Sequence, residues 1–276
     1  MSSANDDHTA PPPRGGRMTF IGTATALISY GSFTFLTDPN FLHAGDHAHL
    51  GYGVRSKRLT DPAMELDDLP HIDFVLLSHH HGDHFDHVVE RRLDKSLPII
   101  TEPGSAARLE RLGFRAVHAL ETWATITVRR GEEWIGITAM PARHAKGPIQ
   151  RVLPHVMGSM VQFGREADPP EFRLYITGDT VLVDELKEIP RRHPDIDLCM
   201  LHLGGTRIAG VLLTMDGRQG VQLLELVQPK VAIPVHYDDY TVFRSPLSDF
   251  LDLLPERLLT TRVVTLERGA TYRFDV

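Results

Sequence analysis

The chain has 276 residues, of which 42% are hydrophobic, and its formal net charge at pH 7 is −7. This length and apolar fraction fit one α/β domain with a substantial core. Lysine and arginine are scattered rather than clustered, which argues against a nucleic-acid partner, and no apolar run reaches the roughly 20 residues of a membrane span.

Residues 1–16 are polar and contain Pro11–Pro13 and Gly15–Gly16, which predicts a disordered lead-in before a folded domain over residues 17–276. This stretch has no apolar segment that could serve as a signal peptide. The single cysteine, Cys199, lies in an apolar, strand-like run and is predicted to be a core residue. With no disulfide available, a cytoplasmic location is expected.

Apolar runs then alternate with helical patterns along the chain. The first half is expected to contain strands within 18–37, a long loop over 40–69, a strand at 72–77, a helix at 87–95, a strand at 98–101, a helix at 104–112 and a strand at 134–139. The second half is expected to contain strands at 158–163 and 173–177, a helix at 182–192, a strand at 197–203, a helix at 217–227 and a strand at 231–235. Strands with interposed helices predict an α/β class with the helices outside.

The long loop over residues 40–69 contains His43, Asp46, His47 and His49. Loops of this length in compact domains tend to be lids or binding loops. The spacing of these side chains is irregular and no strand closely precedes them, which argues against a metal site. Substrate contact and a solvated flap both remain open interpretations.

A histidine-rich motif follows the strand predicted at 72–77. His79, His81, Asp83 and His84 place four potential metal ligands in a short loop. A strand alternates its side chains between two faces, whereas a loop at its end can turn several toward one point. Imidazoles and a carboxylate suit a divalent cation such as zinc. His80, which alternates away from its neighbours, and His87, at the following helix, are predicted not to be ligands.

The pattern His-x-His-x-Asp-His after a strand resembles the signature of the metallo-β-lactamase superfamily. The resemblance implies further ligands downstream, and His144, Asp179 and His236 each stand where an apolar strand is predicted to end. It extends from about Met18 to the C-terminus. It implies a four-layer αββα sandwich with the metals at one edge between two sheets.

A narrower resemblance connects the chain to one branch of this superfamily. Residues 18–28 and 35–39, together with the ending 232–237, are similar to the branch of ascorbate-6-phosphate lactonase and N-acyl phosphatidylethanolamine phospholipase D. That branch usually reads Gly-His-Ala where this chain has Gly22, Thr23 and Ala24. Whatever role the histidine has in those proteins does not carry over to Thr23.

The ligand set implied by the resemblance divides between two divalent ions, zinc or alternatively manganese. Asp179 is expected to bridge the ions, because a carboxylate has two oxygens. Such a pair lowers the pKa of a shared water, which predicts hydrolysis by a metal-bound hydroxide. The first ion is assigned His79, His81 and His144, and the second Asp83, His84 and His236.

Several other residues are candidates for roles around these ligands. Asp83 is the candidate catalytic residue, because it could orient the nucleophile as well as bind metal. Asp38 could fix the tautomer of a ligand histidine, or could simply be a turn residue before Pro39. Arg143, Arg207 and Tyr237 are candidate substrate contacts, with ordinary loop polarity as the alternative. Asp216 is predicted to cap the following helix.

The preferred function is hydrolysis of a small polar ester or lactone, which resembles the lactonase branch. A cationic cluster near the ligands would favour a carboxylate or phosphate on the substrate. Phosphodiester hydrolysis of the phospholipase type is the alternative, although no basic amphipathic helix for lipid is evident. A metal-binding protein without activity is a third interpretation. The expected partner is a small molecule, and the sequence leaves homo-oligomerisation open.

Overall fold

The computed structural model describes residues 15–51, 53–147, 149–150, 153–166, 169–254 and 260–275. The predicted lead-in therefore lies outside the described residues, except for Gly15 and Gly16. These two glycines begin strand β1 (Gly15–Gly22) and pair with β18 (Thr271–Asp275), so their assignment to a disordered segment was wrong. A Cβ on Gly16 would lie 2.2 Å from the Phe274 ring, which explains why glycine occupies this position.

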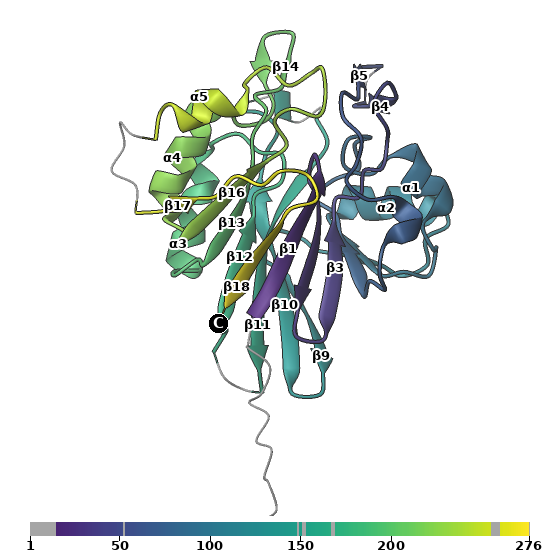
Figure 1. Ribbon diagram of the computed structural model, residues 1–276, viewed down its shortest axis with the longest axis vertical. Coiled ribbons are helices and arrows are strands. Elements are labelled where there is room, and N and C mark those ends of the chain that lie inside the picture. Colours follow the sequence, from purple (N-terminus) through teal and green to yellow (C-terminus); the bar gives the residue numbers. More distant parts are fainter. Residues whose placement is uncertain are drawn as a thin grey trace, which may run out of the picture.

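Two seven-stranded sheets lie face to face (Figure 1). The first has the order β18-β1-β2-β3-β6-β7-β8, and its remaining strands are β2 (Thr25–Tyr30), β3 (Phe33–Thr37), β6 (Phe74–Leu76), β7 (Ile99–Thr101) and β8 (Val117–Ala119).

The second sheet has the order β17-β16-β13-β12-β11-β10-β9. Its strands are β9 (Thr125–Arg130), β10 (Glu133–Ala142), β11 (Val156–Arg165), β12 (Phe172–Ile176), β13 (Leu198–His202), β16 (Val231–Val235) and β17 (Arg262–Val263). Two short hairpins lie outside the sheets. They are β4 (His47–His49) with β5 (Arg55–Lys57), and β14 (Arg207–Ile208) with β15 (Val211–Leu212).

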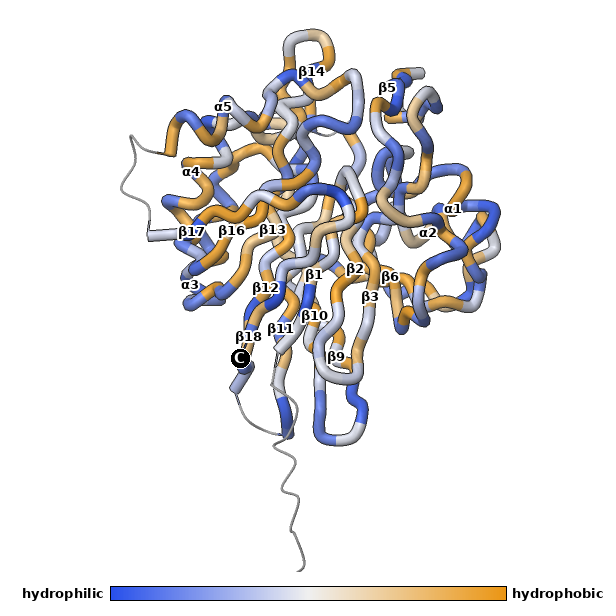
Figure 2. Tube along the Cα trace, in the orientation of Figure 1, coloured by the Kyte–Doolittle hydropathy of each residue, from blue (hydrophilic) through white to orange (hydrophobic). Residues whose placement is uncertain are grey.

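Alternation along the strands separates three apolar clusters. In β6, Phe74 and Leu76 face the cluster between the sheets, whereas Val75 faces the cluster under the helices of the first sheet. In β13, Met200 faces the opposite sheet and Cys199 faces the helices on its other side, so the predicted core position of this thiol is confirmed. Both faces of these strands are buried, and Figure 2 shows hydrophobic residues along the strands.

Helices cover the outer face of each sheet, which completes the predicted αββα sandwich. Helices α1 (His87–Arg92) and α2 (Pro103–Arg111) pack on the first sheet through Val89 and Leu109. The second sheet is covered by α3 (Ile189–Arg192), α4 (Gly217–Val227) and α5 (Leu247–Leu251). Figure 1 places these two helical layers on opposite sides. None of the described helices is long and apolar enough to cross a membrane.

The directions of the strands decide where the ligand candidates meet. Strands β3 and β6 are parallel, as are β12, β13 and β16. Strand β10 runs in the same direction as β12, because both are antiparallel to β11 between them. The chain therefore leaves β6, β10, β12 and β16 at one edge of the sandwich, immediately before His79, His144, Asp179 and His236.

Some predicted elements differ in detail. The segment over residues 40–69 is not a plain loop, since it contains the β4–β5 hairpin and a 3-10 turn, η1 (Leu66–Asp68). Helix α1 ends at Arg92 rather than near residue 95, and the helix predicted at 182–192 is a 3-10 turn, η3 (Asp184–Glu188), followed by α3. Asp216 caps α4 as predicted, because its Oδ1 accepts a hydrogen bond from the Gln219 amide at 3.0 Å.

Candidate metal centre

The loop after β6 is held in shape by its backbone. The amides of His84 and Phe85 both donate to the His81 carbonyl, at 3.0 and 2.7 Å, which turns the chain sharply. The Gly82 amide donates to the His49 carbonyl at 2.9 Å, and a Cβ on Gly82 would lie 2.6 Å from the His49 nitrogen. The glycine of the motif therefore allows hairpin β4–β5 to lie directly against the ligand loop.

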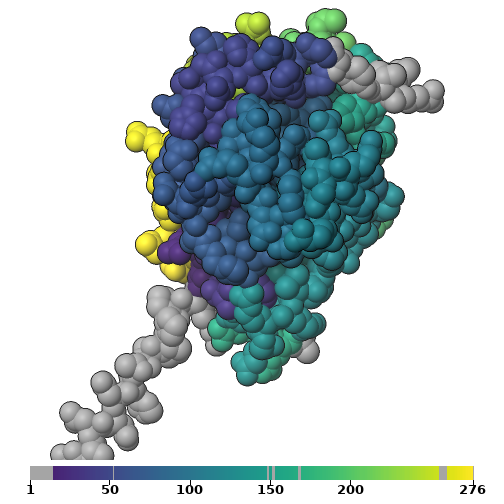
Figure 3. Space-filling model, turned by 90° about the vertical axis from the view of Figure 1, so that its right-hand side faces the viewer, coloured from purple at the N-terminus to yellow at the C-terminus, as the bar shows by residue number. Residues whose placement is uncertain are grey.

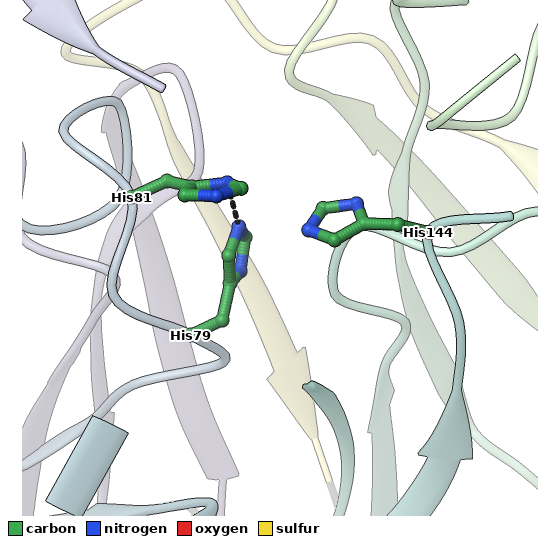
Figure 4. A group of neighbouring side chains, drawn as sticks. All are labelled: His79, His81 and His144. Atoms are coloured by element: carbon green, nitrogen blue, oxygen red, sulfur yellow. Dashed lines mark hydrogen bonds between the residues drawn. The ribbon is translucent and has the colours of Figure 1, made fainter. Parts of the chain in front are cut away.

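Three histidines form the first cluster. His79 and His81 come from this loop, and His144 follows β10 in the opposite sheet, so the rings converge from two sides (Figure 4). The His79 Nε2 and His81 Nδ1 atoms lie 2.9 Å apart, and one ligand atom from each ring lies within 4.8 Å of the others. All three side chains have the chemistry of a zinc site.

Asp83, His84, Asp179 and His236 form the second cluster, again with ligand atoms within 4.8 Å of one another. The His84 Nε2 atom lies 3.2 Å from Asp179 Oδ2, and His236 Nε2 lies 3.5 Å from Asp83 Oδ2. The structure thus brings together all seven side chains predicted as ligands. They form the two groups expected, except that Asp179, which was expected to lie between the two ions, groups with the second cluster. Its bridging role stays a prediction.

Hydrogen bonds at Nδ1 orient three of these rings. The Nδ1 atom lies 3.0 Å from Asp38 Oδ2 in His84, 3.2 Å from the Leu213 carbonyl in His144 and 3.2 Å from the Leu203 carbonyl in His236. Because each of these partners accepts, Nδ1 carries the proton of the neutral ring, which leaves the Nε2 lone pair available to an ion at the centre.

The inward-facing atoms lack partners. The Nε2 atoms of His84, His144 and His236 and the Oδ1 atoms of Asp83 and Asp179 are buried and make no hydrogen bond to the described residues. Leaving a buried polar atom unpaired costs about 1–3 kcal/mol. Divalent cations would pair with all of these lone pairs, so the donor set fits two such ions.

Burial and neighbouring charges set the protonation states. Burial lowers the pKa of His81 to about 3, and His144 beside it acts in the same direction, which keeps the ring neutral and able to ligate. Burial also opposes the charged form of His84, but the Asp179 and Asp38 carboxylates outweigh it and raise the pKa of His84 well above its usual value. Burial alone would raise the pKa of Asp179, yet His236 and His84 hold it well below its ordinary range.

Asp38 and His202 lie directly behind the second cluster. Asp38 Oδ1 accepts a hydrogen bond from the Ser78 amide at 2.6 Å, while Oδ2 holds His84, which supports the predicted role of Asp38 in fixing a ligand tautomer. His202 was missed by sequence reasoning. It ends β13 as His236 follows β16, its Nε2 is buried without a hydrogen-bond partner, and it could ligate together with Asp38 and His84.

The predicted substrate contacts lie elsewhere. The Arg143 side chain pairs with Glu185 at 2.6 Å and borders a separate hollow beside η3. Arg207 reaches the Gly210 carbonyl and Asp216, at 3.4 and 3.5 Å, and also borders a different hollow. Tyr237 packs against the apolar cluster under α3–α5. Substrate contact by these three residues stays a prediction that the cavity beside the metal centre does not support.

Several histidines outside the two clusters pair with carboxylates or lie exposed. The His80 Nε2 lies 3.2 Å from Glu90, and His87 begins α1, so neither belongs to the two clusters. His43 pairs with Asp61 and Glu65, while His47 and His49 lie exposed in β4. Among the described residues, this loop supplies no member to the ligand groups.

A buried arginine supports the segment that carries His236. Arg58 is fully buried, its guanidinium lies 3.3 Å from Asp239, and it donates to Thr23 Oγ1 and Asn40 Oδ1. The Thr23 amide donates to Asp239 at 2.8 Å, and the Thr23 carbonyl accepts from the His236 amide at 2.9 Å. Thr23, where the related branch has histidine, therefore joins Arg58 to the backbone of His236.

A cavity of about 190 Å³ opens beside both clusters. Its base carries His81, Asp83, His144 and Asp179. Its walls are mostly apolar and come from the β4–β5 hairpin, the segment after His144 and the β14–β15 hairpin. The wall residues are Leu50, Gly51, Val54, Ile149, Leu153, Pro154, Thr206, Ile208, Ala209, Val211, Leu213 and Thr214.

An αββα sandwich with buried histidine and aspartate clusters at one sheet edge is the arrangement of a metal-binding protein. The sequence profile of the family described as beta-lactamase superfamily domain matches residues 34–237. The chain therefore belongs to this superfamily, as its histidine motif predicted, and is a metal-dependent hydrolase of the metallo-β-lactamase fold.

Individual relatives agree with this assignment. A UPF0173 metal-dependent hydrolase of Archaeoglobus fulgidus is 28% identical over 260 residues, covering 94% of this chain and 99% of the relative. An N-acyl-phosphatidylethanolamine-hydrolyzing phospholipase D of Caenorhabditis elegans is 26% identical, covering 91% of this chain and 74% of the relative. The crystal structure of an isothiocyanate hydrolase from Delia radicum gut bacteria shares the fold with a TM-score of 0.79 at 19% identity, covering 94% of this chain and 100% of that one.

Proposed function

We propose that this chain hydrolyses a carboxylic ester or lactone with the help of two divalent ions. The observation that carries the proposal is the convergence of seven ligand-type side chains in two clusters at the base of one cavity. Their unpaired, inward-facing Nε2 and Oδ1 atoms support ion binding at both clusters.

The residues divide as follows in this proposal. His79, His81 and His144 would hold one ion, Asp83, His84 and His236 would hold the other, and Asp179 would contribute to both. Bound ions of this kind act as Lewis acids and lower the pKa of water toward neutrality. Zinc suits the imidazole-rich donor set, with manganese as the alternative.

Asp83 is the proposed catalytic residue among the carboxylates. It lines the cavity, and its Oδ1 is buried without a hydrogen-bond partner, while Oδ2 lies 3.5 Å from His236 Nε2. One of its oxygens can therefore ligate while the other accepts a hydrogen bond from the attacking water and orients it toward a carbonyl in the cavity.

Two other functions are weighed against this one. Phosphodiester hydrolysis is supported by the name of the Caenorhabditis elegans relative, but no lysine or arginine is among the cavity residues that the structure describes. A phosphodiester anion would gain from such a cation. A protein that binds metal without turnover is disfavoured by the complete ligand set.

The test is a substrate panel on protein loaded with zinc or manganese, with metal content measured alongside. We expect about two equivalents of metal per chain, as the two clusters require, and turnover of p-nitrophenyl butyrate or γ-butyrolactone. Bis-p-nitrophenyl phosphate tests the second function, and phenyl isothiocyanate tests the reaction named for the solved relative. Cleavage of the phosphodiester without any ester or lactone turnover would contradict the proposal.

Replacing Asp179 by alanine should abolish turnover, because the residue lies between the imidazoles of the second cluster and borders the cavity. The metal content should fall below that of the parent chain, while the circular dichroism spectrum is retained. Asp184→Ala is the matched control, since this carboxylate is exposed and pairs only with Lys187 in the described contacts. Undiminished activity in the Asp179 variant would refute its role.

The remaining predictions about partners and location stand as proposals. The substrate is a small molecule, as the cavity volume of about 190 Å³ favours. A cytoplasmic location remains a prediction, to be checked by fractionation, and homo-oligomerisation remains open, to be checked by light scattering.

A further inference from the structure

We infer that the non-reacting part of the substrate is an uncharged apolar group, an alkyl chain or ring of about the size of benzene, held in the cavity beside the metal centre. The inference rests on the proposed function for the reacting ester or lactone. It replaces the polar substrate expected from the sequence with one whose recognition is hydrophobic.

Two hairpins form facing walls of this cavity. Leu50 and Val54 flank the turn of the β4–β5 hairpin, which is closed by the Leu50 amide donating to the Val54 carbonyl at 2.9 Å. Ile208 and Val211 pair across the β14–β15 hairpin. Figure 1 shows both hairpins at the same end of the molecule, and Figure 3 shows the segment that contains β4 and β5 at the top of the face that carries α1 and α2.

The apolar walls are joined directly to the ligands. Leu213 lines the cavity, and its carbonyl accepts the hydrogen bond from His144 Nδ1 at 3.2 Å. The β4–β5 hairpin contacts the ligand loop through the Gly82 amide and the His49 carbonyl. A group bound between the walls would therefore place its neighbouring atoms at Asp83 and Asp179 at the base.

Exposed hydrophobic surface supports a ligand here. Among the described residues, only Leu59, Leu112 and Ile149 are large hydrophobic side chains that lie exposed, and Ile149 is 38% exposed at the cavity wall. An apolar concave surface beside reactive groups is the usual form of a small-molecule site. Covering Ile149 and its neighbours with an apolar group would remove this surface from water.

The charges around the cavity also favour an uncharged group. The ionisable groups that border the cavity are the histidines and carboxylates of the centre. Arg143 and Arg207, the two arginines predicted as substrate contacts, are paired with Glu185 and Asp216 and border other hollows. An anionic substituent between the apolar walls would lose its hydration without a compensating partner.

The volume sets the size of the group. The cavity measures about 190 Å³. An engineered apolar cavity of about 150 Å³ suffices to bind benzene. A ring of that size or a short alkyl chain fits, whereas the chains of a bilayer lipid would have to extend outside.

Binding tests the inference independently of turnover. Acetamide, butanamide and hexanamide are titrated calorimetrically into the metal-loaded full chain. Each added methylene should tighten binding about fourfold, the factor that corresponds to burying one such group. Succinamate, which carries a carboxylate, should bind at least about tenfold more weakly than butanamide. A flat series, or tighter binding of succinamate, would overturn the inference.

Turnover of the matching p-nitrophenyl acetate, butyrate and hexanoate separates the two proposals. A rising kcat/KM along this series supports both. If no ester is hydrolysed but the amides still bind more tightly with length, the proposed reaction fails and the apolar site stands. If all three esters are hydrolysed equally well and the amide series is flat, the reaction stands and the apolar site fails.

Variants of the cavity wall test whether its apolar residues cause the dependence of kcat/KM on acyl-chain length. Ile149→Asn should lower kcat/KM for hexanoate about fivefold and flatten the rise in kcat/KM from acetate to hexanoate, because it removes apolar surface from the wall. Leu112→Asn is the matched control, since Leu112 is 36% exposed at the end of α2 and outside the cavity. If Ile149→Asn lowers the melting temperature, Val211→Thr, which keeps the side-chain shape, decides instead. Unchanged length dependence in Val211→Thr would then overturn the inference.

Discussion

Asp38 connects two parts of the candidate site, although it is not one of the seven predicted ligands. It adopts a left-handed backbone conformation with φ 36°, and its two oxygens hold the Ser78 amide and the His84 ring. A side chain that orients both the ligand loop and one ligand in it controls the geometry of the site without needing to touch metal.

Replacing Asp38 by asparagine should weaken zinc binding about 10- to 100-fold, because the amide cannot hold His84 Nδ1–H as strongly as the carboxylate does. Competition with a chelator measures the change. Asp73→Asn serves as the control, since Asp73 also accepts from a backbone amide, that of Thr34 at 2.8 Å, but lies away from the centre. Equal affinities in both variants would mean that Asp38 is only a turn residue.

Sequence reasoning at the residue scale succeeded where a local signature existed. His79, His81, Asp83 and His84 were predicted from four close positions, and the structure gathers them with their three distant partners. His202 was missed although it also ends a buried strand, because nothing in its own neighbourhood distinguishes it from a core histidine. Its proximity to Asp38 and His84 arises only from the packing of one sheet on the other.

At the scale of elements, the buried Arg58, which follows the β4–β5 hairpin, pairs with Asp239 in the segment after β16. Its contacts with Asp239, Thr23 and Asn40 join residues that are far apart in sequence. The same hairpin supplies a wall of the apolar cavity, so Arg58 connects this wall to the segment that carries the predicted ligand His236.

Arg58→Met should lower the free energy of unfolding by about 3 kcal/mol or more, because it leaves a buried carboxylate partly unpaired. Urea denaturation measures the loss. Arg191→Met, at a side chain 71% exposed and paired with Glu188, should change stability by less than about 1 kcal/mol. Equal losses in the two variants would show that the buried contacts contribute little.

Asp239, the buried partner of Arg58, should make the stability of the chain depend on pH. Burial alone would raise the pKa of Asp239, but Arg58 and Arg268 hold it below its ordinary value. A depressed folded-state pKa contributes stability above the unfolded pKa of about 3.9, and that contribution is lost as the pH falls toward the folded value. The stability difference between the parent chain and Asp239→Asn should therefore be largest at pH 7 and narrow below about pH 4, as urea titrations at several pH values would detect. A difference independent of pH would rule out this linkage.

The elements themselves were predictable where apolar periodicity was long. The strands at β10, β11, β13 and β16 and helix α4 were predicted within a few residues. The β4–β5 and β14–β15 hairpins were not, because they have only two or three residues per strand and gain their stability from neighbouring segments. For the same reason, the cavity walls could not be predicted from the sequence, since each hairpin contributes only a few apolar side chains.

At the scale of the whole molecule, the last described strand lies beside the first in the same sheet. Strand β18 pairs along β1, and the Phe274 ring stacks on Phe172 of the second sheet with centroids 4.2 Å apart. The two ends of the fold thus lie side by side and bind both sheets together. The four-layer sandwich was implied by family resemblance, whereas this closure was not, because residues 271–275 contain only short alternation.

Phe274→Ala should destabilise the chain by about 3 kcal/mol, since a buried aromatic ring is removed from the junction of the two sheets. The melting temperature and urea midpoint both report the change. Arg273→Ala, the neighbouring exposed position on β18, should stay within about 0.5 kcal/mol of the parent. A small effect at Phe274 would mean that the strand is dispensable for docking the sheets.

The contribution of both sheets to each cluster has a thermodynamic consequence. His79 and His81 follow a strand of the first sheet and His144 follows a strand of the second, so an ion bound in that cluster would cross-link the halves of the sandwich. An ion that binds only the docked halves stabilises the folded chain by mass action, with the midpoint of thermal unfolding rising as free zinc rises. Hydrolytic competence and cohesion of the halves would then respond together to the supply of a single micronutrient.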